Sequence, residues 1–225
     1  HGGQVLALNQ PAEVLIIGGA ALGALLISTP LAVVKAIFAQ LKQALAGGLK
    51  KKDYLDLLVM MFELFNVARK DGLIGLESHV ERPEESEIFK RYPAFLKNHH
   101  AVAFFTDTMR VIISGAVQPH DLEDLMDSDI EVMHEEELRP SEALNSVADA
   151  LPGLGIVAAV LGVVVTMAAI DGPPSEIGHK VAAALVGTFM GILSSYGFVG
   201  PLSGSLKHRL NDNKQYLGCM KHALL

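Results

Sequence analysis

The sequence predicts an all-α, polytopic membrane protein with three membrane spans and a helical domain between the first span and the second. Half of the 225 residues are hydrophobic and only 19% are charged, which is too apolar for an ordinary water-exposed surface. Three stretches, 14–34, 150–170 and 181–206, contain no acidic or basic residue. Each has about the 20 residues that cross the hydrocarbon core of a membrane. No alternation typical of strands or hairpins was found.

The distribution of basic residues predicts how the chain is oriented. Basic side chains follow the first and the last charge-free stretches: Lys35, Lys42, Lys50–Lys52, Lys207, Arg209, Lys214 and Lys221. Because positively charged loops stay in the cytoplasm, we expect segments 35–146 and 207–225 to lie inside the cell. Segments 1–10 and 171–177 lack Lys and Arg and are expected outside. The predicted spans are then 11–34, 147–170 and 178–206, and an outside amino-terminal segment predicts one more span upstream.

Small residues recur at helical spacing along the spans. Gly19 and Gly23 form one pair, and a second series repeats every fourth residue: Ala183, Gly187, Gly191 and Ser195. Small side chains let membrane helices approach closely, because lipid provides no hydrophobic reason for helices to associate. The pattern predicts tight helix packing, either within one chain or within an oligomer.

The segment 35–146 is predicted to be a helical domain. In residues 53–72 we expect a helix with an apolar stripe that ends at Gly72; the stripe residues are Leu55, Leu58, Met61, Phe62 and Phe65. Further helices are predicted for 83–93, for 100–117 with an end near Gly115, and for 120–140.

The sequence excludes several classes of function. A formal charge of −7 leaves no basic face for nucleic acid. The single cysteine rules out an intrachain disulfide, and no nucleotide-binding, metalloprotease, redox or esterase motif is present, so we expect neither a cofactor nor a metal and no enzymatic activity. A transporter would need an ionisable group within a span, and the three charge-free stretches contain none. Any ion-carrying carboxylate must therefore come from a partner or from an upstream segment.

Four strings in the sequence carry a family resemblance. They are "ALNQPAEVLIIGGAALGALL", "ESEIFKRYP", "ADALPGLGIVAAVLGVV" and "ALVGTFMGILSSYGFVGPL". Together they resemble the MotA family of flagellar motor stator subunits, over essentially the whole chain from residue 4 to residue 225. The alternative is a TolQ/ExbB-type proton-channel energiser of outer-membrane processes, which normally has one span before its cytoplasmic domain.

The resemblance implies roles for particular residues. It implies that Arg69 and Glu77 engage the rotor protein FliG, and that Pro152 and Pro201 couple conformational change in the membrane to the cytoplasmic domain. Thr188, Ala159 and Tyr196 would line the ion path. Sodium-driven relatives have a threonine at the position of Ala159, and its missing oxygen favours protons as the coupling ion over sodium.

The resemblance also implies partners and a location. MotB would supply the ion-carrying aspartate, and the subunit would form a pentamer with copies of itself, surrounded by lipid of the cell inner membrane. Protonation of that aspartate would change its fit against the residues of the path, and the resulting motion would act on the rotor.

Overall fold

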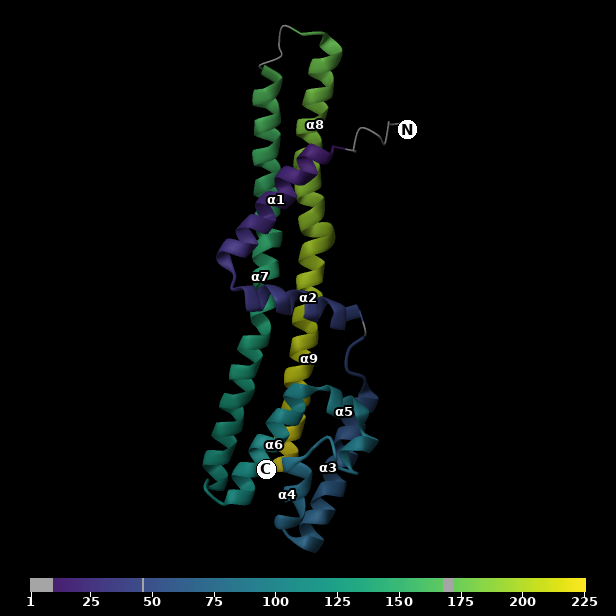
Figure 1. Ribbon diagram of the computed structural model, residues 1–225, viewed down its shortest axis with the longest axis vertical. Coiled ribbons are helices and arrows are strands. Elements are labelled where there is room, and N and C mark those ends of the chain that lie inside the picture. Colours follow the sequence, from purple (N-terminus) through teal and green to yellow (C-terminus); the bar gives the residue numbers. More distant parts are fainter. Residues whose placement is uncertain (1–9, 46, 168–171) are drawn as a thin grey trace. The chain divides into compact units, whose positions relative to one another are not determined.

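The computed structural model describes residues 10–45, 47–167 and 172–225, and nearly all of them are helical, with no strand in these ranges (Figure 1). The all-α prediction is confirmed. Within these residues, three helical stretches are long and apolar enough to cross a membrane: Pro11–Ser28, His120–Met167 and Pro174–Leu224. Almost all of the predicted outer segment 1–10, and positions 168–171 at the end of the second predicted span, lie outside the described residues.

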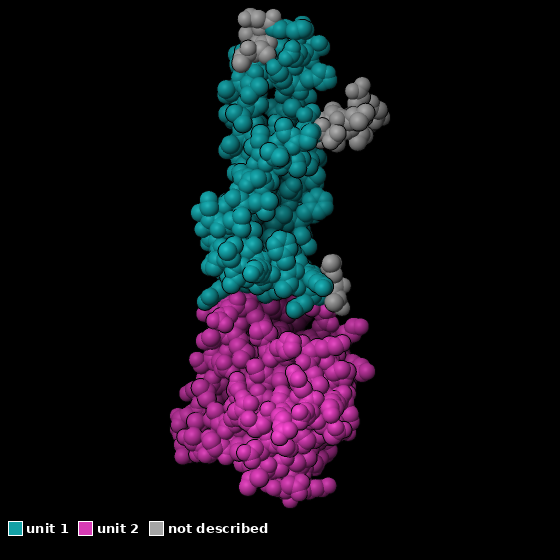
Figure 2. All heavy atoms as spheres, viewed as in Figure 1, with its two compact units in different colours: residues 1–45, 139–207 teal, residues 46–138, 208–225 magenta. Residues whose placement is uncertain are grey.

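The chain forms two compact units (Figure 2). Unit 1 comprises residues 1–45 and 139–207, and unit 2 comprises residues 46–138 and 208–225. Helix α7 (Pro119–Met167) and helix α9 (Gly200–Leu224) each contribute to both units. The remaining helices of unit 1 are α1 (Pro11–Ser28), α2 (Leu31–Leu45), α8 (Pro174–Leu193) and the π-helix η3 (Ser194–Val199).

The first predicted span, 11–34, is divided into two helices. Thr29 has extended backbone angles, with φ −128° and ψ 129°. The residue before a proline is disfavoured in the α conformation, so Pro30 ends α1 at this point. The Pro30 carbonyl then accepts hydrogen bonds from Val33 and Val34 and begins α2, which Figure 1 shows running crosswise to α1. Helix α2 belongs to unit 1 by its contacts, although the predicted helical domain, 35–146, includes most of it.

The predicted boundary at 146/147 is not marked by any break. Helix α7 continues over 49 residues through both Pro140 and Pro152. The last predicted span, 178–206, contains a local change of helix type instead. Gly200 N–H donates to the Ser195 carbonyl, five residues earlier, and Pro201 follows without an N–H to donate. The wider π-helical turn of Ser194–Val199 ends two residues before the proline.

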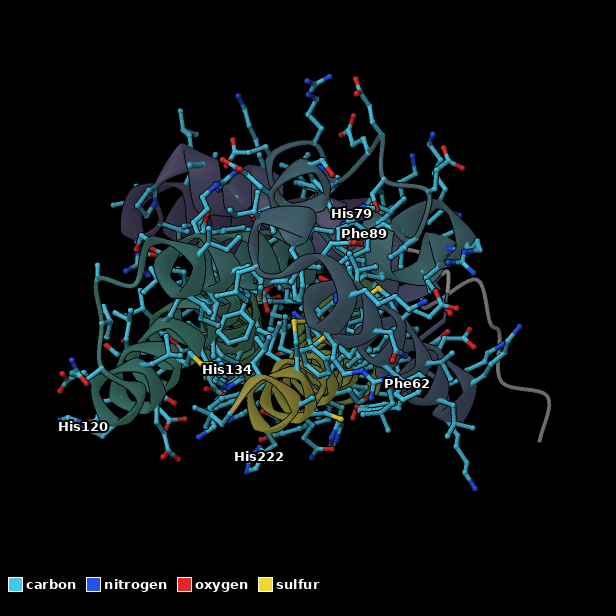
Figure 3. The ribbon with its side chains drawn as sticks, turned by 90° about the horizontal axis from the view of Figure 1, so that it is seen from below. Phe62, His79, Phe89, His120, His134 and His222 are labelled. Carbon is cyan, nitrogen blue, oxygen red and sulfur yellow. The ribbon has the colours of Figure 1, made fainter. Side chains whose placement is uncertain are left out.

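Unit 2 packs its short helices around an aromatic core. These helices are α3 (Lys51–Asp71), α4 (Ile74–Glu81), the 3₁₀ turn η2 (Phe89–Arg91), α5 (Pro93–Lys97) and α6 (His99–Ser114). Phe89 is fully buried, with the rings of Phe95 and Phe105 at centroid distances of 5.1 and 5.6 Å. His79 lies beside Phe89 (Figure 3) and its Nδ1 is 2.7 Å from Ser86 Oγ.

The predicted helix ends at Gly72 and Gly115 are confirmed. The predicted helix over 83–93 forms only turns and the 3₁₀ helix η2 before Pro93, and the predicted helix over 120–140 continues without a break in α7. The predicted stripe of α3 is wrong. Gly72 and Gly115 follow α3 and α6 with φ of 74° and 64°, a region that favours glycine. The buried face of α3 consists of Leu57, Met60, Met61 and Leu64. Of the predicted stripe only Met61 is buried, and the other four residues are exposed; Phe62 lies on the outer side of α3 (Figure 3).

Candidate functional site

Helices α7 and α8 meet in backbone contact. A Cβ at Gly191 would lie 2.7 Å from the Leu151 carbonyl oxygen and 2.8 Å from Gly155 Cα. A Cβ at Gly162 would lie 2.8 Å from the Cβ of Ala184. Such approaches are possible only without side chains at these points. The series at 187, 191 and 195 is therefore turned toward other helices, and all three residues are buried, whereas Ala183 is half-buried.

The first glycine pair behaves differently. No heavy atom lies within 4 Å of the position that a Cβ would take at Gly19 or Gly23. Among the described residues, neither glycine mediates a close helix contact. Their predicted packing role stays a prediction, and it concerns contacts outside the single chain.

Ala159 and Thr188 lie next in sequence to two residues that touch across the helix pair. The ideal Cβ position of Gly187 is 3.4 Å from the Cβ of Ala158. Because successive helical residues are turned by about 100°, Ala159 and Thr188 lie on the faces beside this contact, and both are half-buried. Ala159 lines a cavity of about 270 Å³ between α7 and α8, together with Val160, Val163, Val164, Val181, Ala184 and Leu185. Thr188 is not part of that lining.

The other residues predicted for the ion path and for coupling lie on different surfaces. Tyr196, in the π-helix, exposes 74% of its surface, whereas Ser195 beside it is buried. Pro201 is exposed at the beginning of α9, and Pro152 is half-buried within α7. Nearby, Ser141 and Ser203 form a buried reciprocal pair: each hydroxyl donates to the other's backbone carbonyl, at 3.1 and 2.9 Å.

The predicted rotor-contact residues belong to unit 2. Arg69 lies in the last turn of α3 and Glu77 in the first turn of α4, and both side chains are exposed. Among the described residues neither takes part in an ion pair or a side-chain hydrogen bond. By contrast, Arg91 in the same unit holds Glu63 with two hydrogen bonds of 3.1 and 2.6 Å. Arg69 and Glu77 are thus available to an external partner.

The expectation that no ionisable side chain lies among the packed spans is wrong. Glu13, in the first turn of α1, is only 7% exposed. Its Oε2 occupies the space beside Gly187, 2.8 Å from the position that a Cβ would take there. The sequence signal was weak, because Glu13 lies one residue before the charge-free stretch 14–34 and looks like an ordinary first-turn acid. Only the tertiary contact shows that it is buried.

The fold and this site define a class of protein: a polytopic helical membrane protein built around a glycine-packed pair of helices. Comparison with known proteins narrows the class. Residues 1–72 match the family described as Motility protein A N-terminal, and residues 96–217 match the MotA/TolQ/ExbB proton channel family. The chain therefore belongs to the MotA family of stator subunits, and the match at its amino-terminal part favours MotA over TolQ and ExbB.

Individual relatives support this assignment along the whole chain. The chain is 42% identical to the Vibrio parahaemolyticus protein named Chemotaxis protein LafT, covering 100% of this chain and 79% of that protein. It is 40% identical to Motility protein A of Salmonella typhimurium, covering 100% and 76%.

Two solved structures have the same fold. One is the structure of C. jejuni MotAB, with a TM-score of 0.78, 22% identity and coverage of 99% of this chain and 79% of that chain. The other is the flagellar MotAB stator complex from Bacillus subtilis, with a TM-score of 0.77, 22% identity and coverage of 99% and 80%.

Proposed function

We propose that this chain is a stator subunit of the bacterial flagellar motor that forms, with a MotB partner, a proton-conducting channel coupling ion flow to torque. The main support is similarity along the whole chain to proteins named Motility protein A. The same fold occurs in the MotAB structures of C. jejuni and Bacillus subtilis. In this proposal MotB supplies an ion-carrying aspartate that faces the path beside Thr188.

The proposed coupling ion is the proton. A sodium ion needs several oxygen ligands to replace its water, whereas a proton needs one titratable group and a hydrogen-bonded path. Ala159 offers no oxygen, and every residue that lines its cavity is apolar. Thr188 is the nearby hydroxyl on the facing helix. This donor set fits a proton better than a sodium ion.

The proposed arrangement places unit 2 in the cytoplasm of a cell with the spans in its inner membrane. The basic residues after the first and last spans support this orientation. Arg69 and Glu77, exposed and without an intrachain ion pair, would then contact oppositely charged residues of the rotor protein FliG. Lipid and further copies of the chain, in a pentamer by family resemblance, would cover the exposed apolar surface of the spans.

The decisive experiment is motility in cells that lack their own stator. The full-length chain is supplied with its MotB partner, and swimming speed is measured against external pH and sodium. We expect swimming that follows the proton motive force and does not depend on sodium. Dependence on sodium would overturn the proton assignment, and restoration of an outer-membrane process without motility would favour the TolQ/ExbB class.

Charge reversal tests the rotor contact. Arg69→Glu should impair swimming without lowering the amount of stator complex, because it removes a charge that attracts the rotor. A reversed partner charge on FliG should restore part of the speed. Lys70→Glu is the matched control, since Lys70 is the adjacent exposed cation in the same helical turn. Equal swimming of the Arg69→Glu and Lys70→Glu variants would contradict the assignment.

A further inference from the structure

Glu13 occupies a position where the packing calls for an apolar residue. The buried residues of α1 are Glu13, Ile17 and Ala21, spaced four apart and therefore aligned on one face. Ile17 and Ala21 pack with Leu151 and Ala158 of α7 in the apolar core of unit 1. Helices α1 and α8 are also in contact. Glu13 thus places a carboxylate on the same helix face as the apolar residues Ile17 and Ala21.

The contact lies well inside the span pair, although Glu13 is near the start of α1. Gly187, which Glu13 touches, comes thirteen residues after the first residue of α8, which corresponds to about 20 Å along the helix. Figure 1 shows α1 beginning beside the middle part of α8. Gly187 and Ala158 both lie within the charge-free stretches 181–206 and 150–170. The carboxylate is therefore at the depth of these stretches.

No partner in the described part of the chain satisfies the carboxylate. Glu13 Oε2 is buried and accepts no hydrogen bond there. A glutamate in the first turn often caps its own helix, but no side chain caps the start of α1. An unpaired buried carboxylate is costly, and ionisable groups within membrane spans are rare unless they have a function. Capping therefore does not account for Glu13.

The charged groups on the neighbouring helices are too distant to pair with it. On α8 the nearest are His179, Lys180 and Glu176, and Lys180 bonds to Glu176 at 3.0 Å. Lys180 precedes Gly187 by seven residues, about 10 Å along the helix. On α7 the nearest is Asp149, nine residues or about 13 Å before Ala158. On α2 the nearest is Lys35, beyond the far end of α1.

We propose that Glu13 is a proton-binding group of this chain, held where α1, α7 and α8 meet. This inference rests on the proposed function. It adds a second titratable group to the proton path, besides the aspartate of the partner. Proton binding converts the carboxylate into a neutral carboxylic acid and so removes the unpaired charge. A sodium ion does not fit, because the neighbours Gly187 and Ala158 offer no side-chain oxygen. A Cβ at position 187 would lie 2.8 Å from Oε2, so a larger residue there would displace the carboxylate.

The first test replaces Glu13 in the full-length chain with its MotB partner, in cells without another stator. Glu13→Gln keeps the size of the side chain but cannot exchange a proton. We expect an unchanged yield of the complex and a fall in proton influx by about tenfold or more, with Glu13→Asp retaining more influx than Glu13→Gln. The control is Glu176→Gln, an exposed carboxylate on α8, which should keep wild-type influx.

The outcomes separate the two proposals. Wild-type complex that supports neither swimming nor proton influx would overturn the proposed function, and the role of Glu13 with it. Normal wild-type activity with Glu13→Gln influx within about twofold of it, at equal complex yield, would overturn the Glu13 assignment alone.

A second measurement needs no variant and decides the matter if Glu13→Gln lowers the yield of complex. A lipid-soluble carbodiimide reacts with carboxylic acids in their protonated form, so its addition to Glu13 reports proton occupancy in the wild-type complex. We expect labelling of the peptide that contains Glu13, read by mass spectrometry, that falls as pH rises. Absence of labelling at every pH at which the complex is intact would overturn the proposal.

Discussion

Replacing Gly191 by alanine should separate α7 from α8 and destabilise the stator complex. The added Cβ would lie 2.7 Å from the Leu151 carbonyl oxygen and 2.8 Å from Gly155 Cα, both backbone atoms that no rotamer change can move. Ordinary contact begins at 3.4 Å, so the helices must shift apart by about 0.7 Å along this direction. Overpacking of this kind costs about 1–3 kcal/mol, partly offset by up to about 1 kcal/mol of improved helix propensity.

The matched control for this substitution is Gly178→Ala. Gly178 lies in the same helix, and no other helix among the described residues places a heavy atom within 4 Å of its ideal Cβ position. The Gly178→Ala variant therefore reports the propensity gain alone. The assay is the midpoint of thermal denaturation of the purified complex with MotB, followed by size-exclusion chromatography. For a chain of this size each kcal/mol corresponds to about 2–4 °C, so the Gly191→Ala midpoint should lie at least about 2 °C below that of Gly178→Ala. Equal midpoints would refute the backbone-contact reasoning.

Two further predictions concern individual hydrogen bonds. Ser203→Ala removes the donor to the Ser141 carbonyl in the buried reciprocal pair, and should lower the free energy of unfolding of the complex by about 1 kcal/mol, whereas the exposed Ser205→Ala should not. His100 pairs with Glu137 at 3.0 Å, and this hydrogen bond raises the pKa of His100 above 6.5. A raised pKa in the folded state means that the pair stabilises the protein below pH 6.5 and loses this contribution as pH rises through the raised pKa. The His100→Gln variant should therefore show a free energy of unfolding, measured by chemical denaturation, that changes less with pH across that range. A pH profile unchanged from wild type would contradict this prediction.

Hydrophobic periodicity identified α3 as a helix but selected the wrong side of it. Between Leu55 and Phe65 apolar residues occupy most positions, so several faces are apolar enough to be buried. The face that packs is the one carrying Leu57, Met60 and Leu64. That choice depends on the helices that contact α3, namely α4, α5 and α9, whose positions local sequence does not specify. That this segment is a helix was predictable because helix formation depends on residues close together along the chain. The end of the helix at Gly72 was predictable for the same reason.

The candidate site was predictable where it depends on residue size and not where it depends on tertiary contact. Gly187 and Gly191 could be predicted as packing positions because small residues at every fourth position of a membrane helix typically allow close helix contact. Glu13 was missed because a first-turn glutamate is common in exposed helices. The division of the first span was readable in principle from Thr29-Pro30, but an uninterrupted run of uncharged residues concealed it. The π-helix before Pro201 had no compositional signal.

Most of the apolar surface of the candidate spans is not buried within the single chain, and this determines how the effect of a substitution on stability must be measured. Only 22% to 28% of the apolar window of each candidate span is buried within the single chain. Val157, Val164, Leu185 and Phe189 are among the large hydrophobic residues that remain 49% to 68% exposed. In water such a surface would drive association, so other apolar groups outside the single chain must cover it. A substitution at the glycine contact or at Glu13 therefore changes both the fold of one subunit and its fit in the assembly, and only measurements on the complex with MotB report the free energy that matters for the motor.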